Sequence, residues 1–164
     1  MPVPLREVLP LALLLAGCPS PDDPAALIGS GEIEWESLDD GEAQVIQGPQ
    51  GGFHLLASVR VTGIETGDPG DLLNPNNPTA QFDVVLGGDS MLLTGDFTQG
   101  LERTPAGTDG WTHEVVGRFA ILDIEDDDEL HGETVTFSVS VEDVNGVTVT
   151  DSIELDLERH PLNP

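Results

Sequence analysis

Apolar and polar residues alternate most regularly in residues 133–157, near the end of the chain. In the first arm of this stretch the apolar residues fall at every second position, and the same period returns in the second arm. They are Val135, Phe137, Val139 and Val141, and then Val147, Val149, Ile153, Leu155 and Leu157. A period of two is that of a strand with one buried face, and β-branched residues favour strands. The pattern therefore predicts two strands joined in a hairpin.

The parity of the apolar positions predicts how the two arms are connected. Both arms carry apolar residues at odd numbers, so a three-residue loop ending at Gly146 pairs Val141 with Val149. A two-residue loop would set an apolar face against a polar one. The longer loop is a type I turn followed by a glycine bulge in the left-handed conformation. In this register Asp151 lies opposite Val139 on the apolar face, where a carboxylate needs partners.

Shorter alternating segments fill the rest of the chain, separated by turns rich in Gly, Asp, Asn and Pro. We expect these strands at residues 31–36, 43–47, 53–61, 80–86, 91–93 and 111–121. No stretch has a helical period. Seven to eight short strands predict an all-β fold, an antiparallel two-sheet β-sandwich. Its recognition surfaces are expected on the long loops 64–78 and 98–110.

The last third of the chain resembles the closing strands of immunoglobulin-like, cadherin-like and PKD-like bacterial surface domains. The residues that carry this resemblance are Leu130-x-Gly132-x-x-Val135, Val139-x-Val141-x-Asp143-x-x-Gly146 and Asp151. The resemblance implies an immunoglobulin-like sandwich. The Cys…Trp…Cys core of antibody domains is absent from the sequence.

The first residues carry the pattern of a secretion signal. Arg6 precedes an apolar run at residues 8–16, which is too short to span a bilayer. The following Leu15-Ala16-Gly17-Cys18 resembles the lipobox of bacterial lipoproteins. That resemblance implies cleavage before Cys18, which would carry diacylglycerol and a further acyl chain such as palmitate. The alternative is an ordinary signal followed by a chance cysteine.

We therefore predict a signal peptide at residues 1–17, an acidic Pro-rich tether at 18–30 and the sandwich domain at 31–160. Pro19 follows the cysteine in place of the Asp that marks inner-membrane retention in some bacteria. This favours the outer membrane or cell surface over the inner membrane. With Gly48-Pro49-Gln50-Gly51-Gly52-x-His54 before a strand, the whole chain is also similar to uncharacterised lipoproteins of myxobacterial type, which imply no chemistry.

The charge of the chain limits the kinds of partner that it can bind. It has 31 acidic residues and five Lys or Arg residues, a net charge of −26. Nucleic acid is excluded because its binding needs a basic surface. The charge fits divalent cations, a basic partner or simple solubility.

Calcium is the cation that the acids favour, because it takes six to eight oxygen ligands. The candidate ligands are Asp123, Glu125, Asp126, Asp127, Asp128, Asp143 and Asp151. Their spacing is not that of an EF-hand. A solvated acidic loop is the alternative, and no cofactor is required by either interpretation.

Trp111, at the edge of a long loop, and His54 are the candidate binding residues for a protein or glycan. The alternative is that Trp111 is a core residue at a strand start. No nucleophile elbow, P-loop or zinc-protease motif occurs, so we do not expect an enzyme. The predicted function is a lipid-anchored, non-catalytic envelope module that binds a protein or glycan. The alternatives are a structural lipoprotein without a ligand and a weak calcium-binding adhesion-type domain.

Overall fold

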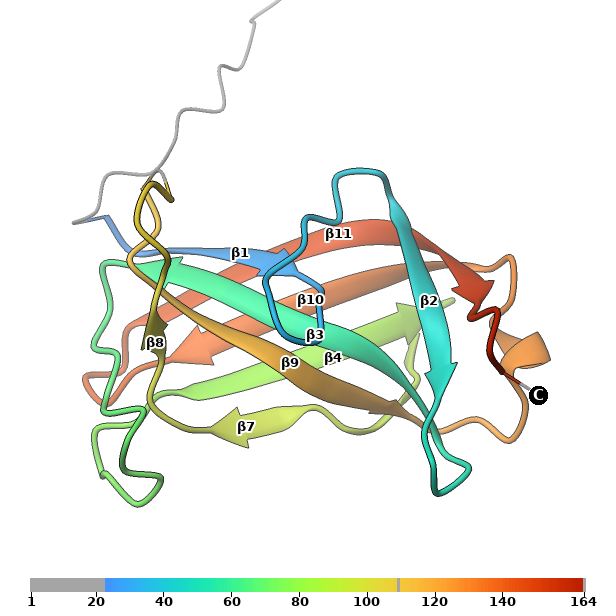
Figure 1. Ribbon diagram of the computed structural model, residues 1–164, viewed down its shortest axis with the longest axis horizontal. Coiled ribbons are helices and arrows are strands. Elements are labelled where there is room, and N and C mark those ends of the chain that lie inside the picture. Colours follow the sequence, from blue (N-terminus) through green and yellow to red (C-terminus); the bar gives the residue numbers. More distant parts are fainter. Residues whose placement is uncertain (1–22, 109, 164) are drawn as a thin grey trace, which may run out of the picture.

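The computed structural model describes residues 23–108 and 110–163, and these residues form an all-β fold (Figure 1). The strands are β1 (Ala25–Gly29), β2 (Glu42–Gln47), β3 (Phe53–Thr62), β4 (Thr79–Leu86), β5 (Asp89–Ser90), β6 (Leu92–Thr94), β7 (Asp96–Thr98), β8 (Glu102–Arg103), β9 (His113–Leu122), β10 (Thr134–Glu142) and β11 (Thr148–Arg159). A single 3-10 turn, η1 (Asp127–Glu129), is the only helical element of the described residues. None of their helical segments has the length and hydropathy needed to cross a membrane. The predicted signal peptide and Cys18 lie outside the described residues.

The strands join into one mixed sheet that curls nearly into a barrel (Figure 1). Its order is β5-β4-β10-β11-β2-β3-β9-β6, with β1 beside β3, β7 beside β4 and β8 beside β9. The ends of this order approach each other at Gly95, which connects β6 to β7. A purely antiparallel arrangement was expected, but β2 pairs with β11 in parallel. That pairing joins the two halves of the sheet.

The interior is filled by the apolar positions of the alternating strands. Val59 of β3, Val84 of β4 and Leu155 of β11 are all fully buried. Phe82 and Phe137 stack at 6.0 Å between ring centroids. Burial of such side chains is the main stabilising contribution to a β fold.

The hairpin β10–β11 has the register that parity predicts. Val141 lies opposite Val149, and Val139 lies opposite Asp151. The Gly146 amide donates to the Asp143 carbonyl at 3.0 Å, and Gly146 has φ 78°. The three-residue loop with a left-handed glycine is therefore confirmed.

The predicted strand 31–36 and the boundary of the predicted tether are wrong. Residues 25–29, placed in the tether, form β1 and pair with residues 58–62 of β3. Residues 31–36 form a loop that folds over the outer face of β3 and β9, closed by one bridge between Ser30 and Glu36. Gly31, at φ 103°, turns the chain, so Ile33 and Trp35 no longer alternate along a strand. A Cβ at Gly29 would lie 2.3 Å from Trp35 Nε1, so the ring packs directly on the glycine.

Candidate functional site

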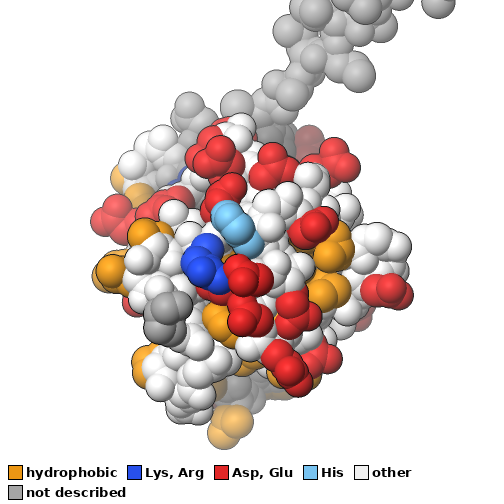
Figure 2. Space-filling view, turned by 90° about the vertical axis from the view of Figure 1, so that its right-hand side faces the viewer, with side chains coloured by type: hydrophobic (Ala, Val, Ile, Leu, Met, Phe, Trp, Pro, Cys, Tyr) orange, Lys and Arg blue, Asp and Glu red, His pale blue; other side chains and the backbone are white. Residues whose placement is uncertain are grey.

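The acidic loop around η1 brings three carboxylates together. Single oxygens of Asp126, Asp127 and Asp128 lie within 4.8 Å of one another. Arg159, near the end of β11, forms ion pairs with them and offsets part of their charge. Its Nη2 lies 2.6 Å from Asp127 Oδ1 and 2.5 Å from Asp128 Oδ1. Figure 2 shows this end of the molecule, where acidic side chains surround a basic one.

Asp127 is the structural centre of this cluster. Its buried carboxylate accepts a hydrogen bond from Asn163 Nδ2 at 2.6 Å, besides the bond from Arg159. These bonds, the one from Asn163 foremost, lower the pKa of Asp127, although burial opposes them. Asn163 also donates to the Val45 carbonyl and accepts from the Gln47 amide. Asn163 therefore fastens the last described residues to β2, and Asp127 holds the Asn163 side chain in place.

The other candidate calcium ligands do not join the cluster as a group. Asp143, at the hairpin loop, is buried and accepts from the amides of Glu65, Asn145 and Val147. Burial raises the pKa of Asp143, but the three backbone hydrogen bonds outweigh it and the pKa is lowered. Asp151 accepts from the Ile28 amide at 2.8 Å. In the described part of the chain, Asp126, Asp127 and Asp128 are the one group with metal-ligand spacing.

The candidate binding residues His54 and Trp111 are both half-buried. The His54 ring packs against Phe119, with 4.6 Å between centroids, and burial lowers the pKa of His54. The Trp111 carbonyl accepts from Thr104 Oγ1 at 2.7 Å. Neither residue stands out from the surface as an anchor.

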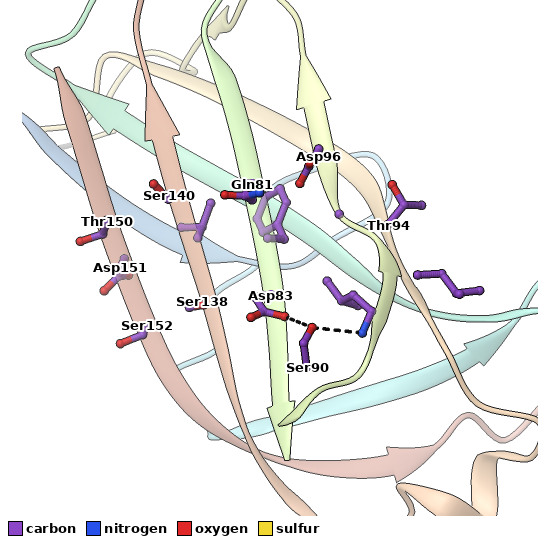
Figure 3. Close-up of a pocket in the computed structure, with 15 residues that line it drawn as sticks. Gln81, Asp83, Ser90, Thr94, Asp96, Ser138, Ser140, Thr150, Asp151 and Ser152 are labelled. Atoms are coloured by element: carbon purple, nitrogen blue, oxygen red, sulfur yellow. Dashed lines mark hydrogen bonds between the residues drawn. The ribbon is translucent and has the colours of Figure 1, made fainter. Parts of the chain in front are cut away.

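A polar groove of about 770 Å³ lies on the outer face of β4, β10 and β11 (Figure 3). Small hydroxyl side chains line it from two neighbouring strands, namely Ser138, Ser140, Thr150 and Ser152. Gln81, Asp83 and Asp96 add an amide and two carboxylates at its other side. The Ser90 hydroxyl donates to Asp83 Oδ1 at 2.5 Å. Such a surface can exchange hydrogen bonds with a polar ligand, but it has no exposed aromatic ring for stacking on a sugar.

A second surface combines exposed apolar side chains from two loops. Leu72 and Leu73 are 71% and 90% exposed, and Ile33 on the other loop is 87% exposed. We call Ile33, Pro69 and Leu72, with the adjoining Leu73, the loop patch. Ile33, Pro69 and Leu72 border a depression of about 280 Å³, which Arg118 also lines. The sequence pointed to the loop 64–78, but not to its two leucines, because they follow no strand period.

The loop that carries the two leucines is held by successive turns. The side chains of Asp68, Asp71 and Asn74 each accept from the amide two residues further on. Backbone bonds also join Asp71 to Asp68, Asn74 to Asp71 and Asn77 to Asn74. The Asn77 side chain is buried; it accepts from the Asp68 amide and donates to the Asp71 carbonyl. The leucines are thus presented on a well-defined backbone.

The loop that carries Ile33 is held by contacts with β3 and β9. The Arg60 guanidinium lies 4.1 Å from the centroid of the Trp35 ring, and its Nε bonds to Glu114 Oε2 at 2.8 Å. A Cβ at Gly117 would lie 2.3 Å from the Glu32 carbonyl oxygen, which shows how closely this loop packs on β9. The part of the loop patch that carries Ile33 therefore rests on the outside of the β3–β9 pair.

The described residues thus offer three candidate binding features: the acidic cluster, the polar groove and the loop patch. The acidic cluster is largely satisfied internally by Arg159 and Asn163. The groove and the loop patch have few internal partners. Comparison with protein-family models, with curated proteins and with solved structures found no match for this chain.

Proposed function

We propose that the protein is a lipid-anchored, non-catalytic module of the bacterial envelope that binds a macromolecular partner through the loop patch. The observation that carries this proposal is the exposure of Ile33, Leu72 and Leu73 on loops with an ordered hydrogen-bond pattern. Clustered apolar side chains on a soluble domain commonly mark an interaction surface. A preorganised loop also loses little entropy on binding.

The lipobox-like Leu15-Ala16-Gly17-Cys18 supports the anchor and the location at the outer membrane or cell surface. The test is metabolic labelling of the expressed protein with an alkyne-bearing palmitate, comparing the natural chain with Cys18→Ser. Label on the natural chain and none on Cys18→Ser is the expected result. Label on both, or on neither, would contradict the anchor.

We further propose that the fold is an immunoglobulin-like sandwich. Adjacent β3 and β9 match the pairing of strands B and E, and adjacent β4, β10 and β11 match C, F and G. The closing hairpin also carries the residues on which the sequence resemblance rests. A crystal structure in which β3 and β9 shared one layer with β10 would contradict this assignment.

A non-catalytic role is supported by what the inward-facing acids do. Asp127, Asp143 and Asp151 each accept hydrogen bonds that hold elements together. Asp127 and Asp143, whose pKa values are lowered, are poor general acids.

Crosslinking in intact cells tests partner binding. A photo-reactive amino acid is placed at position 72 or 73, and position 162 serves as the control because Leu162 is also 84% exposed. We expect a discrete crosslinked product from positions 72 and 73 that is absent from position 162. No product from any position would favour the structural lipoprotein without a ligand.

The polar groove supports a second candidate, a glycan ligand, because its hydroxyls, amide and carboxylates suit a polyhydroxylated molecule. An array of bacterial polysaccharides probed with the natural chain and with Asp83→Asn plus Asp96→Asn tests it. Binding that the double variant loses would support this candidate, and absence of binding would remove it.

A further inference from the structure

We propose that the loop patch receives a basic segment of another protein, one that carries aliphatic side chains between its Lys or Arg residues. This inference rests on the proposed function and adds the chemistry of the partner. It is based on two properties of the same surface: an exposed aliphatic centre and a rim of carboxylates.

The aliphatic centre is unusual in this chain. Ile33, Leu72 and Leu73 are among the most exposed large apolar side chains of the described residues. Burying a leucine or isoleucine removes apolar surface from water, which stabilises a complex against the costs of association. Neither loop needs to fold on binding, because the turns at Asp68 and Asp71 and the packing of Trp35 already hold them.

The rim of this centre is acidic. Glu102 lines the depression, and the exposed carboxylates of Glu32, Glu34, Asp68 and Asp71 adjoin Ile33, Pro69 and Leu72 in the sequence. They outnumber the neighbouring cations. Arg60 is paired with Glu114, Arg118 is half-buried with its guanidinium 5.7 Å from the centroid of the Phe97 ring, and Arg103 is exposed beside Glu102. The field around the patch therefore attracts cationic side chains.

The same charges disfavour other occupants. Two copies of this chain would bring two acidic rims together, each on a molecule with a net charge of −26. A sugar would need an open aromatic face, but the Trp35 face carries Arg60 and Trp111 is half-buried. An acidic peptide would meet Glu34 and Glu102, whose side chains make no hydrogen bond or ion pair within the described part of the chain.

Fluorescence anisotropy with three labelled peptides tests the proposal on the full-length chain carrying Cys18→Ser. One probe alternates lysine and leucine, a second alternates lysine and serine, and a third alternates glutamate and leucine. We expect the lysine–leucine peptide to bind at least about tenfold more tightly than either of the others. Its affinity should fall as salt is added, because the rim charges are exposed.

Variants locate the binding on the surface. Leu72→Ser with Leu73→Ser should weaken the lysine–leucine peptide by about tenfold or more, whereas the matched control Leu162→Ser should not change it. Glu34→Gln with Glu102→Gln should weaken it and reduce its salt dependence. Circular dichroism melts confirm that each variant folds, since all five positions are exposed.

Several outcomes would overturn the inference. One is equal binding of the lysine–serine and lysine–leucine peptides, and another is equal binding by the leucine variant and the natural chain. Crosslinking from position 72 to a second copy of the chain, or to a polysaccharide, would do the same. If crosslinks to a protein form in cells while no lysine–leucine preference is found, the charge assignment fails but partner binding stands. If no crosslinks form, the proposed function itself fails.

Discussion

The carboxylate of Asp151 accepts a hydrogen bond from the backbone amide of Ile28 at 2.8 Å, across 123 positions of sequence. Ile28 lies in β1, which pairs with β3 along one edge. Asp151 lies in β11, which runs beside the other edge of β1 (Figure 1). The bond thus gives an acceptor to an amide that faces away from β3. It also supplies the partner that an acid opposite Val139 requires.

Removal of this acceptor should loosen β1. We expect Asp151→Ala to lower the free energy of unfolding by about 1–2 kcal/mol, because the Ile28 amide loses its partner. Asp151→Asn, which keeps an oxygen acceptor, should cost less. Chemical denaturation gives both values, and amide exchange at Ile28 should be faster in Asp151→Ala. Ser152→Ala, at an exposed neighbour, is the control; an equal loss there would refute the assignment.

Asp143 should make stability depend on acid pH. Three backbone amides lower its pKa in the folded chain below the ordinary 3.8. A carboxyl with a lowered folded-state pKa stabilises the fold at pH values above its unfolded pKa. This stabilisation is lost as the pH falls through the folded-state pKa. The free energy of unfolding, plotted from neutral pH into acid, should therefore fall less steeply for Asp143→Asn than for the natural chain. Parallel curves would contradict the prediction.

Arg159 should limit calcium binding at the acidic cluster. Its guanidinium lies beside Asp127 and Asp128, where a bound calcium ion would have to lie. We expect millimolar calcium to raise the melting temperature of Arg159→Gln more than that of the natural chain, because the three carboxylates then lack a counter-charge. The same melting temperatures are measured with magnesium in place of calcium, because magnesium demands stricter octahedral geometry. An equal response of both chains to calcium would show that the cluster is not where calcium acts.

Buried and exposed leucines should differ sharply in their effect on stability. Leu155 is fully buried, so Leu155→Ala should cost about 2–5 kcal/mol through lost burial and a residual cavity. Leu72→Ala should change stability by less than about 0.5 kcal/mol, because Leu72 is 71% exposed. Urea denaturation of both variants checks this contrast. A large loss of stability in Leu72→Ala would mean that the leucine packs against the fold and is not free to contact a partner.

The closing hairpin was predictable because its information is local. The parity of Val141, Val149 and their neighbours determines the register once one face is buried, and Gly146 meets the requirement of the loop. Residues 31–36 show the limit of this reasoning. Ile33 and Trp35 alternate with glutamates as in a strand, but Gly31 turns the chain and Trp35 packs back on Gly29.

The alternation of side chains was enough by itself to determine that this protein is built of strands with one apolar face, and that Asp151 needs a partner. Only the tertiary structure decided that the partner is Ile28, that Arg159 pairs with the acidic loop, and that Leu72 lies exposed beside Ile33. The physical reason is distance along the chain. A strand period is a property of adjacent residues, whereas these contacts form between segments that meet only after the sheet has curled around its core.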